Sequence, residues 1–169
     1  MRKLGIFLAA VLLPLSLVFA QTSDTPIVRY SDLRHPIFGA NGMVSSQNAH
    51  ATEVGAQVLA DGGNAVDAAV AVGFALAVTL PRAGNLGGGG FMLVHPSDGS
   101  PPVFFDYREK APLASTVDMF VEGGSRKNHR YVGVPGTVRG LSLAHETYGA
   151  LPWADLVQPA VTLAEDGFV

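Results

Sequence analysis

Charged and aromatic residues that could bind a substrate are concentrated at residues 106–110, which read Asp-Tyr-Arg-Glu-Lys and follow the apolar residues Val103-Phe104-Phe105. The planar guanidinium of Arg108 can bind a carboxylate through two parallel hydrogen bonds, and enzymes bind amino-acid substrates in this way. Charges of both signs stand side by side here, so the alternative is a solvent-exposed cluster of salt bridges. The residue types by themselves leave both interpretations open.

A glycine-rich run precedes this stretch, at residues 84–90. Backbone N–H groups in such loops can bind phosphate, but Met92 and Leu93 break the dinucleotide spacing and no Gly-Lys-Ser/Thr follows. The order is also helix, glycines, strand, which is the reverse of a nucleotide loop. We therefore expect tight backbone packing or a turn with positive φ, and no bound nucleotide.

Two partial motifs near the C-terminus do not indicate catalysis or metal binding. Ser142 stands in Gly-Leu-Ser-Leu-Ala, which lacks the second glycine and the preceding strand of a serine-hydrolase elbow. We interpret it as an ordinary serine within a helix. His145 begins His-Glu-Thr-Tyr-Gly, which fails as a zinc helix because the last position is not histidine. The sequence contains no cysteine and no closely spaced histidines, so we assign no metal and no cofactor.

The secondary-structure elements that must position these residues include both helices and strands. Residues 65–80 are apolar on nearly all sides, with Asp67 the only charge, and such a helix is normally buried in a larger body. Asn64 is expected to cap it and Pro81 to end it. The pattern favours an α+β class or a layered α/β/β/α arrangement over a doubly wound parallel sheet. We expect helices over residues 49–61, 65–80, 138–148 and 153–166, strands over 91–95 and from 103, and a possible short strand over 43–46.

Composition and the N-terminus restrict the partners and the compartment. The chain has 169 residues and a net charge of −3, with no stripe of Lys and Arg, which argues against nucleic acid. Residues 1–20 have a basic start, an apolar run and Val-Phe-Ala at the end, so we predict a signal peptide cleaved after Ala20 and an exported protein. An uncleaved membrane anchor is the alternative, but the run is short and Pro14 interrupts it.

Several segments together resemble the γ-glutamyltransferases, also called γ-glutamyltranspeptidases or glutathione hydrolases. They occur in the order of that family, and the resemblance extends from about Gly39 to Val169. The matching segments are residues 62–71 (GGNAVDAAVA), 83–92 (AGNLGGGGFM), 106–112 (DYREKAP), 135–140 (PGTVRG) and 163–168 (LAEDGF).

The resemblance implies a fold and a reaction. The family has the α/β/β/α sandwich of the N-terminal-nucleophile hydrolases, and its precursor cuts itself into a large and a small subunit. The threonine freed at the start of the small subunit attacks the γ-amide of glutathione or a related compound. Water or an acceptor amino acid or peptide then resolves the γ-glutamyl-enzyme. The arginine of the matching motif binds the substrate α-carboxylate, and this role transfers to Arg108.

In this chain no threonine lies in the Thr-Thr-His type of junction that precedes the family's nucleophile. We therefore expect residues 21–169 to be the N-terminal part of a large subunit, a fragment that needs the rest of that subunit and the small subunit. The fragment would contain the substrate-binding residue Arg108 but no catalytic residue. It would therefore have no activity of its own.

Two other functions remain open at this point. A cephalosporin-acylase-like glutaryl amidase shares the scaffold, and its substrate would still present a carboxylate to Arg108. The chain could also be a non-catalytic exported module that binds acidic amino acids. The apolar helix expected over residues 65–80 argues against the module, because it needs more protein around it.

Overall fold

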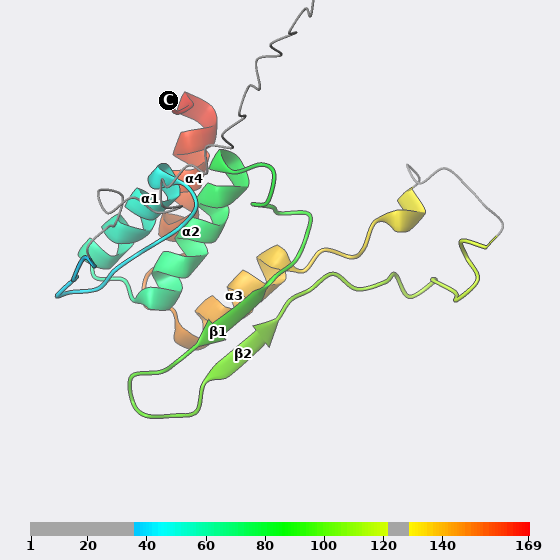
Figure 1. The fold of residues 1–169 in the computed structure, drawn as a ribbon, viewed down its shortest axis with the longest axis horizontal. Coiled ribbons are helices and arrows are strands. Elements are labelled where there is room, and N and C mark those ends of the chain that lie inside the picture. The colour runs from blue at the N-terminus through cyan, green and yellow to red at the C-terminus, as the bar shows by residue number, and fades with distance from the viewer. Residues whose placement is uncertain (1–35, 122–128) are drawn as a thin grey trace, which may run out of the picture. The chain divides into compact units, whose positions relative to one another are not determined.

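The computed structural model of the chain describes residues 36–121 and 129–169. The predicted signal peptide, residues 1–20, lies outside this range. Within the described ranges, no helix is both long enough and apolar enough to cross a membrane. The elements are α1 (Ala49–Ala60), α2 (Ala65–Thr79), β1 (Phe91–Val94), β2 (Val103–Asp106), the 3-10 helix η2 (His129–Tyr131), α3 (Thr137–Tyr148) and α4 (Trp153–Asp166) (Figure 1).

Helix α2 is the central element, in contact with α1, α3 and α4. Its Val70, Ala71 and Ala75 are fully buried, and Phe74 packs edge-on against Trp153 of α4. Small side chains over most of the helix let the neighbouring helices approach closely. The predicted burial of this apolar helix is therefore confirmed, and it explains why α2 contributes more residues to the hydrophobic core than any other element.

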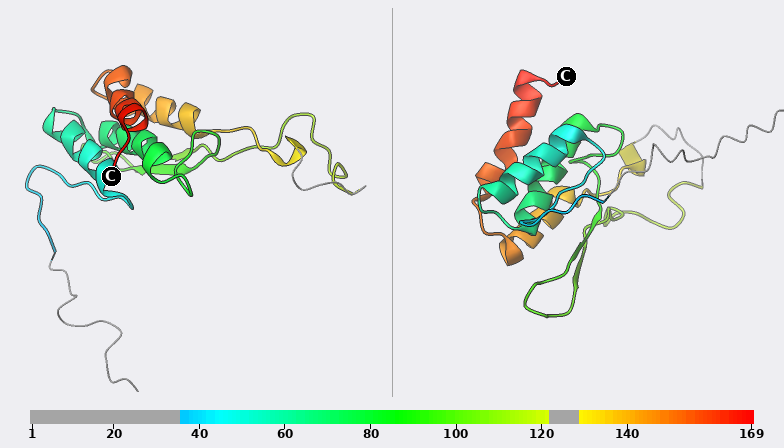
Figure 2. Two further views of the ribbon diagram at one scale, coloured as in Figure 1. Left: turned by 90° about the horizontal axis from the view of Figure 1, so that it is seen from above. Right: turned by 60° about the vertical axis from the view of Figure 1, so that its left-hand side comes forward.

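The strands β1 and β2 form an antiparallel hairpin, in which Phe91 pairs with Asp106 and Leu93 with Phe104. One face packs against the helical core through Met92, Val94, Val103 and Phe105. The other face carries Phe91, Leu93 and Phe104, which are all exposed. Figure 2 shows the helices gathered on one side of the hairpin. The expected α+β class is confirmed, and the described residues contain this one hairpin of the layered sandwich.

The possible short strand over residues 43–46 is not formed. These residues carry no strand assignment, and the sheet in the described part of the chain consists of β1 and β2 only. A strand needs a neighbour that accepts and donates its backbone hydrogen bonds. No described segment supplies one beside Val44, whose side chain packs instead against the hydrophobic core.

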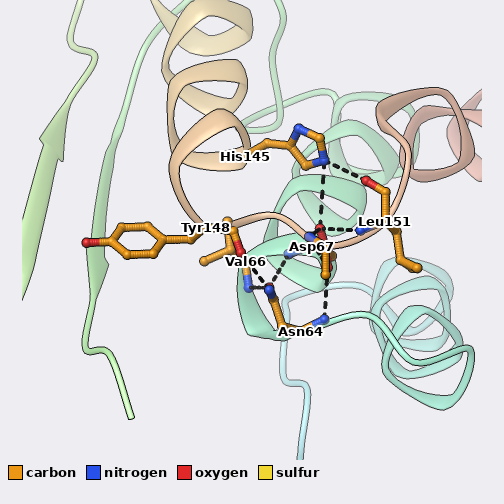
Figure 3. A network of polar contacts seen from close by, with 7 residues as sticks. Asn64, Val66, Asp67, His145, Tyr148 and Leu151 are labelled. Atoms are coloured by element: carbon orange, nitrogen blue, oxygen red, sulfur yellow. Dashed lines mark hydrogen bonds and ion pairs between the residues drawn. The ribbon is translucent and has the colours of Figure 1, made fainter. Parts of the chain in front are cut away.

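The N-terminus of α2 is capped as the sequence predicts. The Asn64 side-chain oxygen accepts hydrogen bonds from the backbone N–H groups of Val66 at 2.8 Å and Asp67 at 3.1 Å. In return the Asp67 carboxylate accepts from the Asn64 backbone N–H at 2.9 Å, which completes a capping box. The Asn64 amide also donates to the Tyr148 carbonyl at 2.6 Å, so this cap ties α2 to the end of α3 (Figure 3).

Asp67, the only charge in α2, is fully buried and reaches beyond its own helix. Its carboxylate accepts hydrogen bonds from the backbone N–H groups of Ala150 at 3.0 Å and Leu151 at 3.5 Å, in the loop between α3 and α4. His145 lies beside it, with Nε2 at 3.8 Å from the carboxylate and 2.8 Å from the Leu151 carbonyl, to which it donates (Figure 3). A buried carboxylate is tolerated when donors surround it, and here they are backbone groups of two segments.

Candidate functional site

Arg108 lies directly after β2, where the chain leaves the hairpin. Its backbone N–H donates to the Asp106 carboxylate at 3.0 Å. The side chain is 69% exposed, and its Nε lies 3.5 Å from a carboxylate oxygen of Glu109. In the part of the chain that the structure describes, no other carboxylate forms an ion pair with Arg108. The guanidinium therefore faces solvent beside one acidic neighbour, and it is open to a further carboxylate.

The backbone around Arg108 lies against two glycines. A side-chain Cβ on Gly89 would lie 2.6 Å from the Tyr107 carbonyl oxygen and 2.9 Å from the Arg108 Cα, so no side chain fits there. A Cβ on Gly136 would also collide with the Tyr107 carbonyl. The glycine-rich run is thus required for close backbone approach, as one of the two sequence interpretations proposed. The other interpretation, a turn with positive φ, is wrong for this run.

A polar contact fastens the glycine-rich run to the start of α3. The side-chain oxygen of Asn85 accepts from the Thr137 hydroxyl at 2.6 Å and from the Gly88 backbone N–H at 2.9 Å. The Gly88 carbonyl in turn accepts from the backbone N–H groups of Gly136 at 2.8 Å and Thr137 at 3.1 Å. We call Asn85, Gly88, Gly89, Arg108 and Thr137 the arginine cluster.

Tyr107 fills the space next to this cluster. Its ring lies against Gly140 of α3 and Gly90, where no side chain could be accommodated. The phenol donates to the Phe91 carbonyl at 3.3 Å, and partial burial raises the pKa of Tyr107 above its ordinary value. Tyr107 therefore acts as a packing group and hydrogen-bond donor.

Three of the segments singled out in the sequence meet at the arginine cluster: residues 83–92, 106–112 and 135–140. Asn85 and Thr137 were not predicted as site residues. The signal that could have found them is a polar residue at the head of the glycine-rich run and a threonine opening a helix after Pro-Gly. The segment 62–71 does not join the cluster, because its Asn64 and Asp67 bind the other end of α3.

The residues of the two partial motifs have ordinary structural roles. Ser142 lies within α3, as predicted, and its hydroxyl donates to the Glu146 carboxylate at 2.6 Å. That hydrogen bond is the main reason why the pKa of Glu146 is lowered. His145 faces the buried Asp67 network. Among residues 36–121 and 129–169, no three histidine, aspartate or glutamate side chains gather in a way that could hold a metal ion.

Comparison with known proteins decides the family. The family model described as Gamma-glutamyltranspeptidase matches residues 51–169, which include every residue of the arginine cluster. The chain belongs to the γ-glutamyltranspeptidase family. The Escherichia coli (strain K12) protein named glutathione hydrolase proenzyme is 50% identical over 160 residues, covering 89% of this chain and 27% of that protein. The chain thus spans about a quarter of the length of this relative.

Solved structures of the γ-glutamyltranspeptidase family have the same fold in this region. The γ-glutamyltranspeptidase of Helicobacter pylori superposes with a TM-score of 0.74 at 45% identity, covering 79% of this chain and 40% of that one. The cephalosporin acylase of Bacillus halodurans superposes with a TM-score of 0.73 at 29% identity, covering 85% of this chain and 27% of that one. The described residues are therefore a portion of the N-terminal-nucleophile hydrolase fold that the sequence indicated.

Proposed function

We propose that residues 21–169 are the N-terminal part of the large subunit of an exported γ-glutamyltransferase. The whole enzyme hydrolyses glutathione and related γ-glutamyl amides, or transfers their γ-glutamyl group to acceptor amino acids and peptides. Family membership and the glutathione hydrolase proenzyme names of the relatives support this proposal. The observation that carries it for this chain is Arg108, an exposed guanidinium in one family segment, whose backbone packs against two others.

In the proposed reaction Arg108 binds the α-carboxylate of the γ-glutamyl group through two charge-assisted hydrogen bonds. Fixing this end of the substrate places the γ-carbonyl carbon against the nucleophile. The nucleophile is a threonine hydroxyl supplied by another part of the precursor, with its own α-amine as base. Its oxygen forms an ester with the γ-carbonyl, the amide bond breaks, and the proton goes to the leaving amine. Water or an acceptor amine then cleaves the ester.

The hairpin supports the proposal that this chain needs further segments of the same precursor. Phe91 and Phe104 stack on its outer face with ring centres 5.6 Å apart, and Leu93 beside them is 69% exposed. Adjacent exposed apolar side chains on one sheet face are typical of a surface that another part of the protein covers. The rest of the large subunit and the small subunit are the proposed partners. Export rests on the signal peptide predicted at residues 1–20.

A glutaryl amidase is the second candidate, because the cephalosporin acylase of Bacillus halodurans superposes almost as well as the γ-glutamyltranspeptidase. A glutaryl group has a carboxylate for Arg108 but no α-amine. A non-catalytic binding module is disfavoured, since the exposed hairpin face indicates a larger assembly.

The deciding experiment uses the complete precursor that carries this segment. We expect a gel to show two subunits, and we expect release of nitroaniline from γ-glutamyl-p-nitroanilide to be much faster than from glutaryl-p-nitroanilide. Residues 21–169 alone should release none, since positioning does not replace covalent catalysis. Preference for the glutaryl compound would favour the amidase. An uncleaved precursor that binds glutamate without turnover would favour the binding module.

A further inference from the structure

Asn85 and Thr137 form the shortest side-chain contact of the arginine cluster, at 2.6 Å, yet neither has a polar contact with Arg108. We infer that this pair positions Arg108 for the substrate carboxylate, through the glycine backbone that lies between them. The inference rests on the proposed function, because it assigns Thr137 and Asn85 a role in the same substrate-binding site. They are positioning residues, since their action on the substrate passes through Arg108.

Thr137 is connected to the glycine-rich run through the side chain of Asn85. Thr137 is 7% exposed, and its hydroxyl donates to the Asn85 side-chain oxygen. That same oxygen accepts the Gly88 backbone N–H, and the Asn85 amide nitrogen is anchored by the Ala83 carbonyl at 3.1 Å. The hydroxyl is therefore one of three hydrogen-bond partners that hold the Asn85 side chain with its oxygen facing Gly88.

The glycine-rich run in turn packs against the backbone of Arg108. Gly88 and Gly89 are adjacent, and the Gly89 Cα lies so close to the Tyr107 carbonyl and the Arg108 Cα that a single added carbon would collide with both. Backbone segments packed this closely transmit a displacement, because they deform little. A shift of Gly88 must therefore be followed by the backbone of Arg108. The guanidinium lies at the end of a long side chain, and a small rotation of the backbone moves it further.

Thr137 also makes a backbone hydrogen bond, so the role of its hydroxyl can be tested separately from its contribution to the fold. Its backbone N–H donates to the Gly88 carbonyl at 3.1 Å, and the Gly136 N–H donates to the same oxygen. These bonds persist when valine replaces Thr137, since valine has the same shape and keeps the backbone. Thr137→Val thus removes the hydrogen bond to Asn85 and puts a methyl group against the Asn85 oxygen, while the backbone hydrogen bonds stay. Thr137→Ser restores the hydroxyl, and Thr147→Val is the matched control, because Thr147 is an exposed threonine at the other end of α3.

The test uses the complete precursor and two substrates that differ in the α-carboxylate. γ-Glutamyl-p-nitroanilide presents this carboxylate to Arg108, whereas 4-aminobutyryl-p-nitroanilide lacks it. We expect Thr137→Val to lower kcat/KM for the γ-glutamyl compound roughly tenfold through a raised KM, because misplacement of a positioning contact costs catalysis steeply. For the 4-aminobutyryl compound, kcat/KM per mature active site should change less than about twofold. Thr137→Ser should recover most of the tenfold loss.

The arginine variant separates this inference from the proposed function. In an Arg108→Lys background, Thr137→Val should have less than about a twofold further effect, because coupled residues are not additive. An equal loss on both substrates, or an unchanged KM, would overturn the inference and leave Thr137 a residue of the fold. If Arg108→Lys lowers kcat/KM and Thr137→Val does not, only the positioning role fails. If Arg108→Lys has no effect, carboxylate binding by Arg108 fails as well. Should Thr137→Val give no mature enzyme, Asn85→Ala takes its place, since Asn85 is half-buried and water can replace its oxygen.

Discussion

The two ends of helix α3 hold two polar clusters with opposite properties. At the C-terminal end, Asp67 is fully buried and its carboxylate is surrounded by backbone donors and His145 (Figure 3). At the N-terminal end, Thr137 and Asn85 are held by the glycine-rich run, and the charged group beside them, Arg108, is 69% exposed. The same helix thus connects a charge whose partners are all inside the chain with a charge that faces solvent.

The difference supports the proposal that one cluster serves the fold and the other a ligand. A buried carboxylate with several donors contributes to stability, and its loss leaves those donors without partners. An exposed guanidinium with one neighbouring carboxylate contributes little to stability, so its fixed backbone is better explained by a ligand. Both clusters use segments that the sequence comparison singled out. Family resemblance alone does not distinguish them, whereas burial and hydrogen bonding do.

Loss of the buried carboxylate should have the largest effect. Asp67→Ala leaves the N–H groups of Asn64, Ala150 and Leu151 without an acceptor, and we expect the precursor to lose about 3 kcal/mol of stability or more. The measurement is urea unfolding followed by circular dichroism. Asp166→Ala, at an exposed position on α4, is the control and should change stability by less than about 0.5 kcal/mol. A similar loss in both variants would contradict the assigned role of Asp67.

A methyl group in the glycine-rich run should disturb substrate binding. Gly89→Ala places a carbon against the backbone of Tyr107 and Arg108, and we expect kcat/KM for γ-glutamyl-p-nitroanilide to fall roughly tenfold or more. Gly87→Ala is the matched control in the same run, because a Cβ added at Gly87 would have no neighbouring atom within 4 Å. Equal kinetics of the two variants would show that the close approach of Gly89 is unrelated to binding.

The ion pair of Arg108 with Glu109 should matter little. Both side chains are exposed, and such pairs contribute about 0.2–1 kcal/mol. We therefore expect Glu109→Gln to change kcat/KM by less than about threefold, with unaltered separation into two subunits. A more than tenfold loss of kcat/KM would mean that Glu109 orients the guanidinium. Glu109 would then belong to the arginine cluster.

The smallest effect is expected at Ser142. Its hydroxyl donates to the exposed Glu146 and lies on the outside of α3. Ser142→Ala should leave the rate of nitroaniline release unchanged within about twofold, and the pKa of Glu146 should rise towards its ordinary value, which titration by NMR can follow. A large loss of activity would revive the serine-hydrolase interpretation.

Local sequence signals predicted the elements well and the contacts between them poorly. Asn64 and Pro81 gave the limits of α2, since caps and breakers act on their own neighbours along the chain. The possible short strand over residues 43–46 is not formed, because strand pairing depends on a distant partner. The Asn85–Thr137 contact joins residues 52 positions apart, so no local pattern could reveal it.

Arg108 itself was predicted from its residue type and from the resemblance. The structure adds the exposure of its side chain and the glycine contacts that hold its backbone. Asp67 stood out in the sequence only as the single charge of an apolar helix. Its role required the folded structure, because its donors come from the loop between α3 and α4.

The central claim is that Arg108 binds the α-carboxylate of a γ-glutamyl substrate. The most direct measurement compares wild-type and Arg108→Lys precursor in steady-state kinetics on γ-glutamyl-p-nitroanilide and 4-aminobutyryl-p-nitroanilide. Lysine keeps the charge but loses the bidentate geometry, and a lost charged hydrogen bond of about 1.5–3 kcal/mol corresponds to a roughly ten- to hundredfold lower kcat/KM. We predict this loss on the γ-glutamyl compound, almost none on the compound without the carboxylate, and normal autocleavage. Unchanged kcat/KM on both substrates in a properly cleaved enzyme would contradict the claim and leave Arg108 a surface residue of a salt bridge.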